Sequence, residues 1–420
     1  MGRGVSLARA TLTLLAGGAL AQLIPLALGP LIARLFTPEA FGLYTQFFTV
    51  AAALAVAASL RYEQALPLAP DDGEARALLA LALALVGVAT LLCLPLAWAL
   101  HAAGWLPLPA LLPLAMASTG LLQVLMLWTN RAQRFRALAV SRVAQYGGGA
   151  LLQLALGWAL WQGAATGGAG AWALALAPLV AQLLACAWLV RPVPAGGWSA
   201  LAGVPAGELR AVARRQRDFA LVNTPHAFLG LLQDALAVAL LMAWSGEAAA
   251  GFWGLALRYL KAPATLVGSA VSQTLYPRLA AAEPAQAQQL VRQVMALLAV
   301  PALLLMALLL AAGPWLFELA FGAPWREAGE LARALSPYIA AHLVASPLAV
   351  VTMAWRAQRW AFRLALLGQA AFVLALALGL RLGGLLGGAW ALSAVMVPYF
   401  GWYFWRLARW RDIPVQGQAA

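Results

Sequence analysis

Two basic residues stand one helical turn apart in a segment that is otherwise apolar enough to cross a membrane. They are Arg258 and Lys261, in the stretch RYLKAPATLVGSAVSQTLYP, and Lys261 is the only lysine of the chain. A cation at mid-bilayer costs at least ~2.5–3.5 kcal/mol on insertion scales, so such side chains face a bundle interior or a wet cavity. Their chemistry suits anions, because lysine is a compact charge that can lose its proton when desolvated and arginine can fork onto a phosphate.

Polar residues recur every three or four positions in two neighbouring segments, which places each set on one helical face. Asp234 lies ten residues before Trp244 and Lys261 lies ten residues after Gly251, on the two sides of the turn that joins the segments, so both are roughly 15 Å deep at the helical rise. We therefore expect Asp234 to be a counter-charge or a proton carrier for Lys261 or Arg258. An ion pair that only holds two helices together is the alternative. The two polar sets are Asn223, His226, Gly230 and Gln233 or Asp234, and then Arg258, Lys261, Thr265, Ser269 and Ser272.

Three further charged residues stand at the ends of expected spans. Arg61 and Glu63 follow the second span in the stretch RYEQALPL, and Arg34 ends the first span. Arg61 and Glu63 are candidates for a gate that admits the cargo, with Glu63 as a counter-charge or proton-coupling group, and Arg34 is a candidate gating residue. For each of them, an interfacial anchor is an equally open interpretation.

The composition excludes a soluble or disordered chain. Hydrophobic residues make up 64% and charged residues 10%, and the mean hydropathy is +0.83, whereas soluble domains have about 25% charged residues. Eighteen tryptophans suit a protein with many membrane–water boundaries. The fold class we predict is an all-α polytopic membrane protein, with about 12 transmembrane helices in two six-helix bundles around a central cavity.

The net charge of +13 is interpreted as arginine anchoring of cytoplasmic loops, and no nucleic-acid partner is expected. Cys93 and Cys186 lie far apart in apolar runs, which is typical of small buried hydrophobes. No His, Cys, Asp or Glu has metal-ligand spacing, so neither a metal nor a cofactor is expected. The chain carries no arrangement typical of an enzyme active site.

The expected spans place arginines about five to one on the side of the N-terminus, which predicts cytoplasmic N- and C-termini. We expect an N-terminal six-helix bundle at 1–191, a cytoplasmic linker with a basic amphipathic segment at 192–217, a C-terminal six-helix bundle at 218–405 and a cytoplasmic tail at 406–420. The spans are predicted at 10–34, 41–60, 77–100, 108–130, 137–161, 168–190, 219–243, 251–277, 293–313, 331–354, 361–380 and 384–405. A second amphipathic segment, EPAQAQQLVRQ from Glu283, is expected to lie along the inner surface.

The two halves share a short pattern. The first external loop reads PEAFGLY and the loop before the eighth span reads EAAAGFW, with Gly42 and Gly251 at equivalent places. Because each half has six spans, the halves would be parallel repeats related by an axis along the membrane normal, with a cavity between them.

Several blocks in this order carry a family resemblance. They are ARLFTPEAFGLY, RYEQALPLAPDD, RDFALVNTPHAFL, RYLKAPATLVGSAVSQTLYPRLA and APWREAG. From about residue 10 to 405 the chain resembles the bacterial lipopolysaccharide O-antigen flippases of the multidrug, oligosaccharidyl-lipid and polysaccharide superfamily. Ala220 departs from the proline expected after Arg-Asp-Phe, which leaves the local geometry at the start of the seventh span open.

The resemblance implies two six-helix bundles in a V around a central cavity. It implies alternating-access movement of an undecaprenyl-pyrophosphate-linked oligosaccharide from the inner to the outer leaflet of the bacterial inner membrane, with H+ or Na+ as a possible coupling ion. It also implies that Arg258 and Lys261, and then Arg61 and Arg34, meet the head group, with Asp234 as their counter-charge or a proton carrier.

Two other functions stay open. A multidrug–cation antiporter of the same superfamily shares the fold, but it would favour exposed cavity carboxylates, and only Asp234 is clearly deep. A membrane-embedded polysaccharide polymerase or ligase would be expected to carry a large external loop with polar catalytic residues, and the expected external loops are short.

Overall fold

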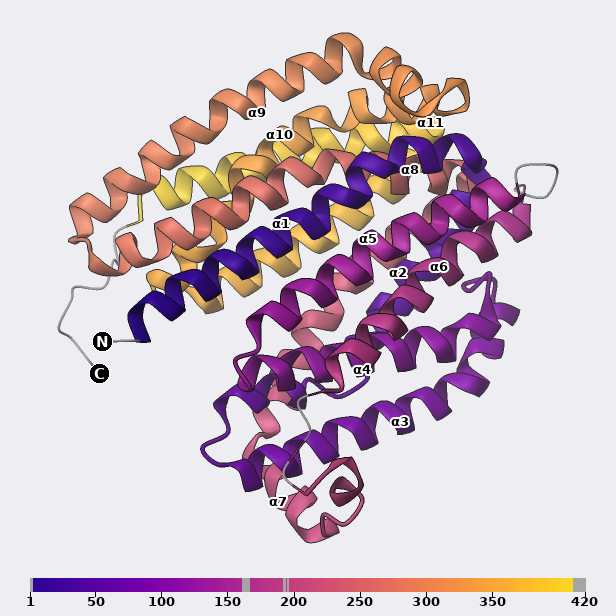
Figure 1. Cartoon of the computed structure of the whole chain (residues 1–420). Coiled ribbons are helices and arrows are strands. Elements are labelled where there is room, and N and C mark those ends of the chain that lie inside the picture. The colour runs from indigo at the N-terminus through magenta and orange to yellow at the C-terminus, as the bar shows by residue number, and fades with distance from the viewer. Residues whose placement is uncertain (1–2, 161–166, 192–193, 195, 411–420) are drawn as a thin grey trace. The chain divides into compact units, whose positions relative to one another are not determined.

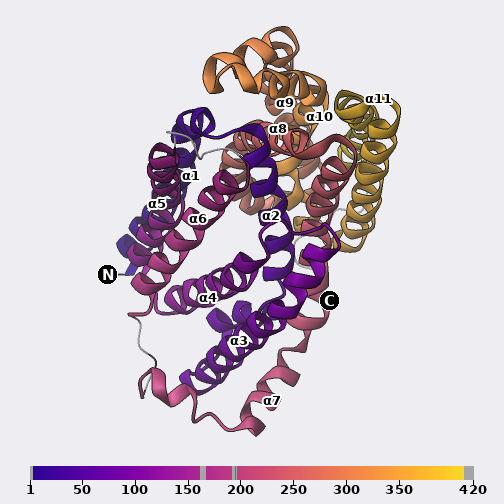
Figure 2. The same cartoon turned by 90° about the vertical axis from the view of Figure 1, so that its right-hand side faces the viewer.

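The computed structural model describes residues 3–160, 167–191, 194 and 196–410 (Figure 1; Figure 2). Within this part of the chain the regular secondary structure is helical and contains no strand. Helices dominate because hydrocarbon offers no water to the peptide groups, so each N–H and C=O must be bonded within its own segment. Residues 192, 193 and 195 of the predicted linker and residues 411–420 of the predicted tail lie outside the described residues.

The chain divides into two compact units, Met1–Ala239 and Leu240–Ala420. The predicted boundaries at residues 191, 217 and 405 stay a prediction. The long helices that precede the linker are α1 (Arg3–Leu35), α2 (Pro38–Ala55), α3 (Asp72–Ala102), α4 (Leu112–Arg131), α5 (Phe135–Leu160) and α6 (Gly167–Leu189). The long helices that follow it are α8 (Thr224–Ala281), which begins in the first unit, α9 (Pro284–Phe321), α10 (Arg326–Ala354) and α11 (Gln358–Ala408).

Two of these long helices are broken at glycine. Gly246 has φ 87° inside α8, and Gly383 and Gly384 interrupt α11, with Gly384 at φ 60°. Glycine adopts these left-handed angles without steric cost, so the chain can turn back into the membrane there. The described residues therefore form twelve long helical segments, six before the linker and six after it, which confirms the predicted span count.

Among the described residues, eight helical stretches are long and apolar enough to cross a membrane, and the two longest, Phe219–Ala281 and Gln358–Ala408, contain the glycine breaks. The helices α2 and α5 complete the twelve and pack against these stretches within the first unit. The protein is thus a multi-pass membrane protein.

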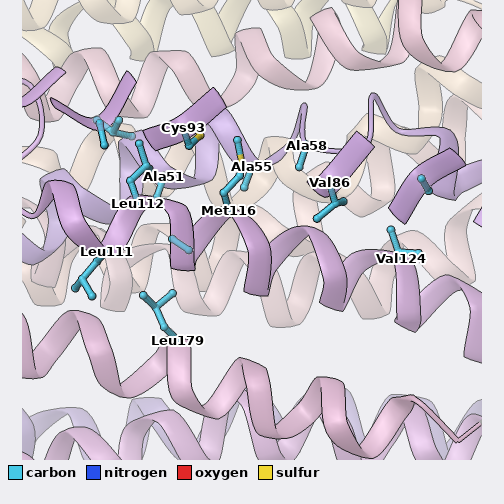
Figure 3. Close-up of a cluster of buried hydrophobic side chains, with 14 of the residues drawn as sticks. Ala51, Ala55, Ala58, Val86, Cys93, Leu111, Leu112, Met116, Val124 and Leu179 are labelled. Atoms are coloured by element: carbon cyan, nitrogen blue, oxygen red, sulfur yellow. The ribbon is translucent and has the colours of Figure 1, made fainter. Parts of the chain in front are cut away.

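The first unit is organised around α6. Helix α5 packs between α1 and α6, while α4 packs against α3 and α6, and α2 also contacts α6. Figure 3 shows part of its buried cluster, in which Ala51 and Ala55 of α2, Val86 and Cys93 of α3, and Met116 of α4 lie near one another. Small residues permit close helix approach in a membrane, where lipid tails compete with apolar packing.

In the second unit α10 packs against both α9 and α11. A Cβ added at Gly329 of α10 would lie 2.4 Å from Cα of Pro314 in α9, and one added at Gly313 would lie 2.9 Å from the Gly329 carbonyl oxygen. The two backbones thus meet directly at this crossing. The Ser393 hydroxyl of α11 donates to the carbonyl of Ala334 in α10 at 2.6 Å, which ties the third helix to the pair.

Short helices fill the connections. They are η1 (Tyr62–Leu68), η2 (Pro109–Leu111), η3 (Trp198–Leu201), α7 (Ala206–Arg215), the π-helical turn η4 (Phe219–Asn223) and η5 (Ala323–Trp325). The basic segment predicted in the linker contains a short helix, α7, whose Val212 is buried.

Two predicted element boundaries are wrong. Helix α2 ends at Ala55 and not at residue 60, because the N–H groups of Ala57 and Ala58 bond carbonyls three residues back instead of four. Leu60 and Arg61 then adopt φ 48° and 57°, angles that a helix cannot continue. The helix predicted to begin at residue 293 begins at Pro284, so the segment after Glu283 is the first part of the 38-residue α9. At 1.5 Å per residue α9 is about 57 Å long and exceeds a hydrocarbon core of about 30 Å.

We expect Gly329→Val to lower the free energy of unfolding by about 3 kcal/mol, because the added side chain would overlap backbone atoms of Pro314 that cannot rotate away. Thermal unfolding of the purified protein in detergent measures this. The matched control is Gly87→Ala in α3, where nothing lies within 4 Å of the added Cβ. Equal melting temperatures for Gly329→Val and the wild type would contradict the close crossing.

Candidate functional site

The second half of α8 carries the two cations on adjacent turns. Arg258 and Lys261 are both half-buried, and they follow the Gly246 break by about 18 and 22 Å at the helical rise. That distance places them well inside a hydrocarbon core of about 30 Å. A half-buried cation is held away from bulk water, so its attraction for an anion is stronger than at the surface.

The rest of the polar stripe is satisfied locally. The hydroxyls of Thr265 and Ser269 donate to the carbonyls of Ala262 and Leu266 at 2.8 and 2.9 Å. Ser272 donates to the carbonyl of Pro347 in α10 at 3.3 Å. Their hydroxyl hydrogens are therefore used within the protein, and the charged atoms of the stripe belong to Arg258 and Lys261.

Aromatic rings of α9, α10 and α11 lie near this turn of α8 within the second unit, directly or through His342. The Tyr259 ring lies 4.7 Å from that of Phe321, and His342 of α10 is close enough to Lys261 for their charges to interact. The His342 ring packs against Tyr338 at 5.8 Å and Phe400 at 6.2 Å between ring centroids. The sequence did not connect His342 with Lys261, because no pattern relates positions 81 residues apart on different helices.

A second charged group occupies the junction between α2 and α3 in the first unit. Glu63 is 3% exposed and accepts a short hydrogen bond from the Ser59 hydroxyl. Arg61, half-buried, precedes η1 in a left-handed backbone conformation. Burial raises the pKa of the Glu63 carboxyl above its ordinary value, with the Ser59 hydrogen bond and the Arg61 charge acting in the opposite direction. Positive φ at two consecutive non-glycine residues, Leu60 and Arg61, shows that the surrounding contacts impose this turn.

Arg131, at the last turn of α4, holds this junction in place. Its guanidinium donates to the carbonyls of Leu66 (3.3 Å), Ala69 (2.6 Å) and Asp71 (3.1 Å) and to the Asp72 carboxylate (3.1 Å). The Arg131 side chain is only 18% exposed. In the sequence Arg131 was one more arginine of a cytoplasmic loop, and only the fold reveals this bonding.

The linker helix α7 docks on the same end of the first unit. Arg215 donates to the Glu74 carboxylate at 2.6 Å, Gln216 donates to its other oxygen at 3.2 Å, and the Tyr62 hydroxyl donates to the Ala213 carbonyl at 3.2 Å. The Glu74 side chain is 7% exposed. Helix α7 thus closes over the start of α3 and over η1, directly before the chain enters α8.

The six predicted site residues fall into two pairs and two separate positions. Arg258 and Lys261 share a turn of α8, and Arg61 and Glu63 share the η1 junction. Arg34 is exposed in the last turn of α1, and Asp234 is half-buried in the part of α8 that belongs to the first unit. A pair between Asp234 and either cation would join the two units, and it stays a prediction.

Long apolar helices broken at glycine, with two cations inside α8, define a multi-pass helical membrane protein. Solved structures share the fold. One titled as the inward-facing conformation of a multidrug resistance MATE family transporter of the MOP superfamily has a TM-score of 0.67 at 15% identity, covering 94% of this chain and 96% of that one. Lipid II flippase MurJ in an inward closed conformation also has a TM-score of 0.67, at 10% identity and with 95% and 89% covered.

A third similar structure, a MOP superfamily transporter from Pyrococcus furiosus, has a TM-score of 0.52 at 15% identity and covers 96% of each chain; its title states that a reversed polarity of the binding pocket suggests a different function. No curated protein matches the sequence. The family model described as polysaccharide biosynthesis protein matches residues 31–330. The chain belongs to this polysaccharide biosynthesis family, which confirms the resemblance found in the sequence.

We expect Arg131→Ala to lower the free energy of unfolding by about 2–4 kcal/mol, because three backbone carbonyls and a carboxylate lose a charged donor at once. Arg131→Lys should recover only part of this loss, since one ammonium cannot reproduce the planar fork. Thermal unfolding in detergent is the measurement, with the exposed Arg210→Ala as the control. Full recovery by lysine would mean that charge alone, and not this geometry, holds the junction.

The buried Glu63 predicts a pH dependence of stability. Because its pKa is raised in the fold, its contribution is fully present at acidic pH below its unfolded pKa and is lost as the pH rises through the folded value. The melting temperature of the wild type should therefore fall over this upward range, and Glu63→Gln should flatten the profile. Glu208→Gln, which removes an exposed carboxylate of the same unit, should leave the wild-type slope. A Glu63→Gln profile as steep as that of the wild type would refute the assignment.

Proposed function

We propose that this protein is a flippase that moves an undecaprenyl-pyrophosphate-linked oligosaccharide from the inner to the outer leaflet of the bacterial inner membrane. The product would serve the synthesis of a surface polysaccharide such as O-antigen or exopolysaccharide. Both termini would lie in the cytoplasm, and transport would proceed by alternating access. Membership in the polysaccharide biosynthesis family and the fold shared with lipid II flippase MurJ support this proposal.

The observation that carries the proposal is the pair of cations inside α8. Arg258 and Lys261 are half-buried on adjacent turns, in a segment where a charge is costly unless it serves a path or a partner. A pyrophosphate carries the opposite charge, so meeting these cations would offset the cost of removing it from water. Arginine would bind its oxygens with two parallel hydrogen bonds, and lysine would add a point charge that can reorient as the head group moves.

Arg61 and Arg34 would contact the head group at the two ends of the path. Asp234 or Glu63 would serve as the counter-charge or would couple transport to H+ or Na+. The burial of Glu63 supports it as a proton carrier, because its raised pKa brings protonation closer to physiological pH.

Export of small cations is the second candidate, favoured by the fold shared with the multidrug resistance MATE family transporter. A cation pocket would be expected to present carboxylates, and here the deep charges of α8 beyond Gly246 are Arg258 and Lys261. A polysaccharide polymerase or ligase within the membrane is a third candidate, and no observation on the structure favours it. The solved structures with this fold named above are transporters and a flippase.

The test is complementation of a gene deletion in the native host with wild type, Arg258→Ala, Lys261→Ala and Lys261→Arg. We expect the alanine variants to reduce surface glycan by about ten-fold or more, since each loses a charged hydrogen bond to the cargo, which contributes roughly 1.5–3 kcal/mol. Undecaprenyl-linked oligosaccharide should accumulate on the inner leaflet. Lys261→Arg keeps the charge and should retain part of the activity.

The control is Arg326→Ala, which removes an exposed arginine paired with Glu318 at the outer end of α10; membrane levels of every variant are measured alongside. Normal surface glycan in the deletion strain, without accumulation of the lipid-linked intermediate, would overturn the flippase assignment. If the deletion strain loses surface glycan and both alanine variants restore it, the flippase assignment stands, but Arg258 and Lys261 are not its site.

A further inference from the structure

The second unit has an end at which arginine and tryptophan side chains concentrate. The last turns of α11, the start of α9 and the turn from α10 to α11 meet there. We call this the arginine–tryptophan end, and its members are Arg292, Arg356, Arg359, Arg406 and Arg409 with Trp355, Trp360, Trp402, Trp405 and Trp410.

Ring contacts hold these elements together. Trp410 lies 4.9 Å from Trp360 and 6.2 Å from Trp355 between ring centroids, and Trp360 also stacks on Tyr403 at 6.0 Å. Arg292 donates two hydrogen bonds, at 3.0 and 2.7 Å, to the Ala408 carbonyl at the end of α11. Gln288 donates to the Trp410 carbonyl at 3.1 Å. The end is therefore a packed scaffold and not a set of unrelated loops.

The charge of this scaffold is one-sided. Residues 284–300, 350–364 and 400–410 contain no aspartate or glutamate, and the five arginines are all exposed. Among the described residues none of the five has an ion pair. Arg406 lies over the Trp410 ring at 5.4 Å and Arg409 over the Trp405 ring at 5.1 Å, which orients both guanidinium groups along the aromatic surface.

Apolar surface accompanies the charge. Trp402 is 47% and Trp405 49% exposed, on the same last turns of α11 as Arg406 and Arg409. In addition, the indole N–H of the buried Trp355 has no acceptor in the part of the chain that the structure describes. An occupant would therefore need a negatively charged group with acceptor oxygens for the arginines and an apolar body for the exposed indoles.

We propose that the arginine–tryptophan end binds an anionic phospholipid of the surrounding bilayer, with its head-group phosphate on Arg406 and Arg409 and its glycerol and acyl region on Trp402 and Trp405. Tryptophan is enriched at the level of the lipid head groups, and basic clusters at that level attract anionic lipids. This site is separate from the cations of α8 and does not depend on the proposed function. The general enrichment of arginine in cytoplasmic loops would explain the presence of these arginines, but not their stacking on exposed indole rings.

The test uses the purified full-length protein in a neutral detergent, titrated with fluorescent phosphatidylglycerol and, separately, fluorescent phosphatidylcholine, with no oligosaccharide present. We expect tighter binding of phosphatidylglycerol. The double variant Arg406→Gln/Arg409→Gln should weaken it by about ten-fold or more, because each arginine near an anionic surface contributes severalfold. Phosphatidylcholine binding should not change.

The matched control is Arg326→Gln/Arg381→Gln, which removes the same charge from exposed positions elsewhere in the unit, including the Arg381 that stacks on Trp244 at 4.5 Å. Equally weakened phosphatidylglycerol binding in both double variants would mean that only net charge matters, and it would overturn the proposal. Unchanged binding in Arg406→Gln/Arg409→Gln would overturn it as well. Displacement of the lipid by millimolar inorganic pyrophosphate would assign the site to free phosphate groups instead.

Trp405→Leu keeps the test decisive if the arginine variant does not fold, because Trp405 is half exposed and its ring supports Arg409. This variant should weaken phosphatidylglycerol binding severalfold without lowering the melting temperature. Wild-type affinity in a folded Trp405→Leu protein would overturn the proposal.

Discussion

A peptide group in hydrocarbon must find its hydrogen-bond partner within the protein, and in most of this chain a helix supplies that partner. Where the chain leaves a helix, side chains have to bond the backbone carbonyls instead. The junction after α2 leaves the helical ladder, and its carbonyls are bonded by the Arg131 guanidinium. The end of α11 is bonded by Arg292 and Gln288 from α9. Arginine suits both places, because it bonds several acceptors from one rigid plane and keeps its charge.

Because water is scarce inside the membrane, a charge within a span is costly and indicates a function or a partner. Most arginines of this chain stand near helix ends, where they can reach the head groups, whereas Arg258 and Lys261 lie inside α8. Both side chains are half-buried, beside a Tyr259 ring that packs on Phe321 of α9, and partial burial strengthens the attraction of a cation for an anion. The arrangement agrees with cargo that is itself acidic, as the lipid-linked intermediates of polysaccharide synthesis are.

The shared fold does not by itself select a cargo. At 10–15% identity the solved structures with the same helix arrangement include a multidrug transporter and a lipid II flippase. Helix number, the glycine breaks and close crossings such as that between Gly313 and Gly329 are what the bilayer and the packing demand. The charges that line the helices vary independently of these requirements, so function has to be argued from residues such as Lys261.

The sequence by itself determined the membrane class, the twelve long helices and the cation pair of α8, because apolar runs of about 20 residues and a three-residue spacing are local properties. It also placed Glu63 among the candidates, but not its burial beside Ser59. Only the tertiary structure decided that Arg131 bonds the η1 junction, that α7 docks on Glu74, and that His342 neighbours Lys261. These contacts join residues 59 to 142 positions apart, and no local pattern encodes such pairs: they arise when helices pack.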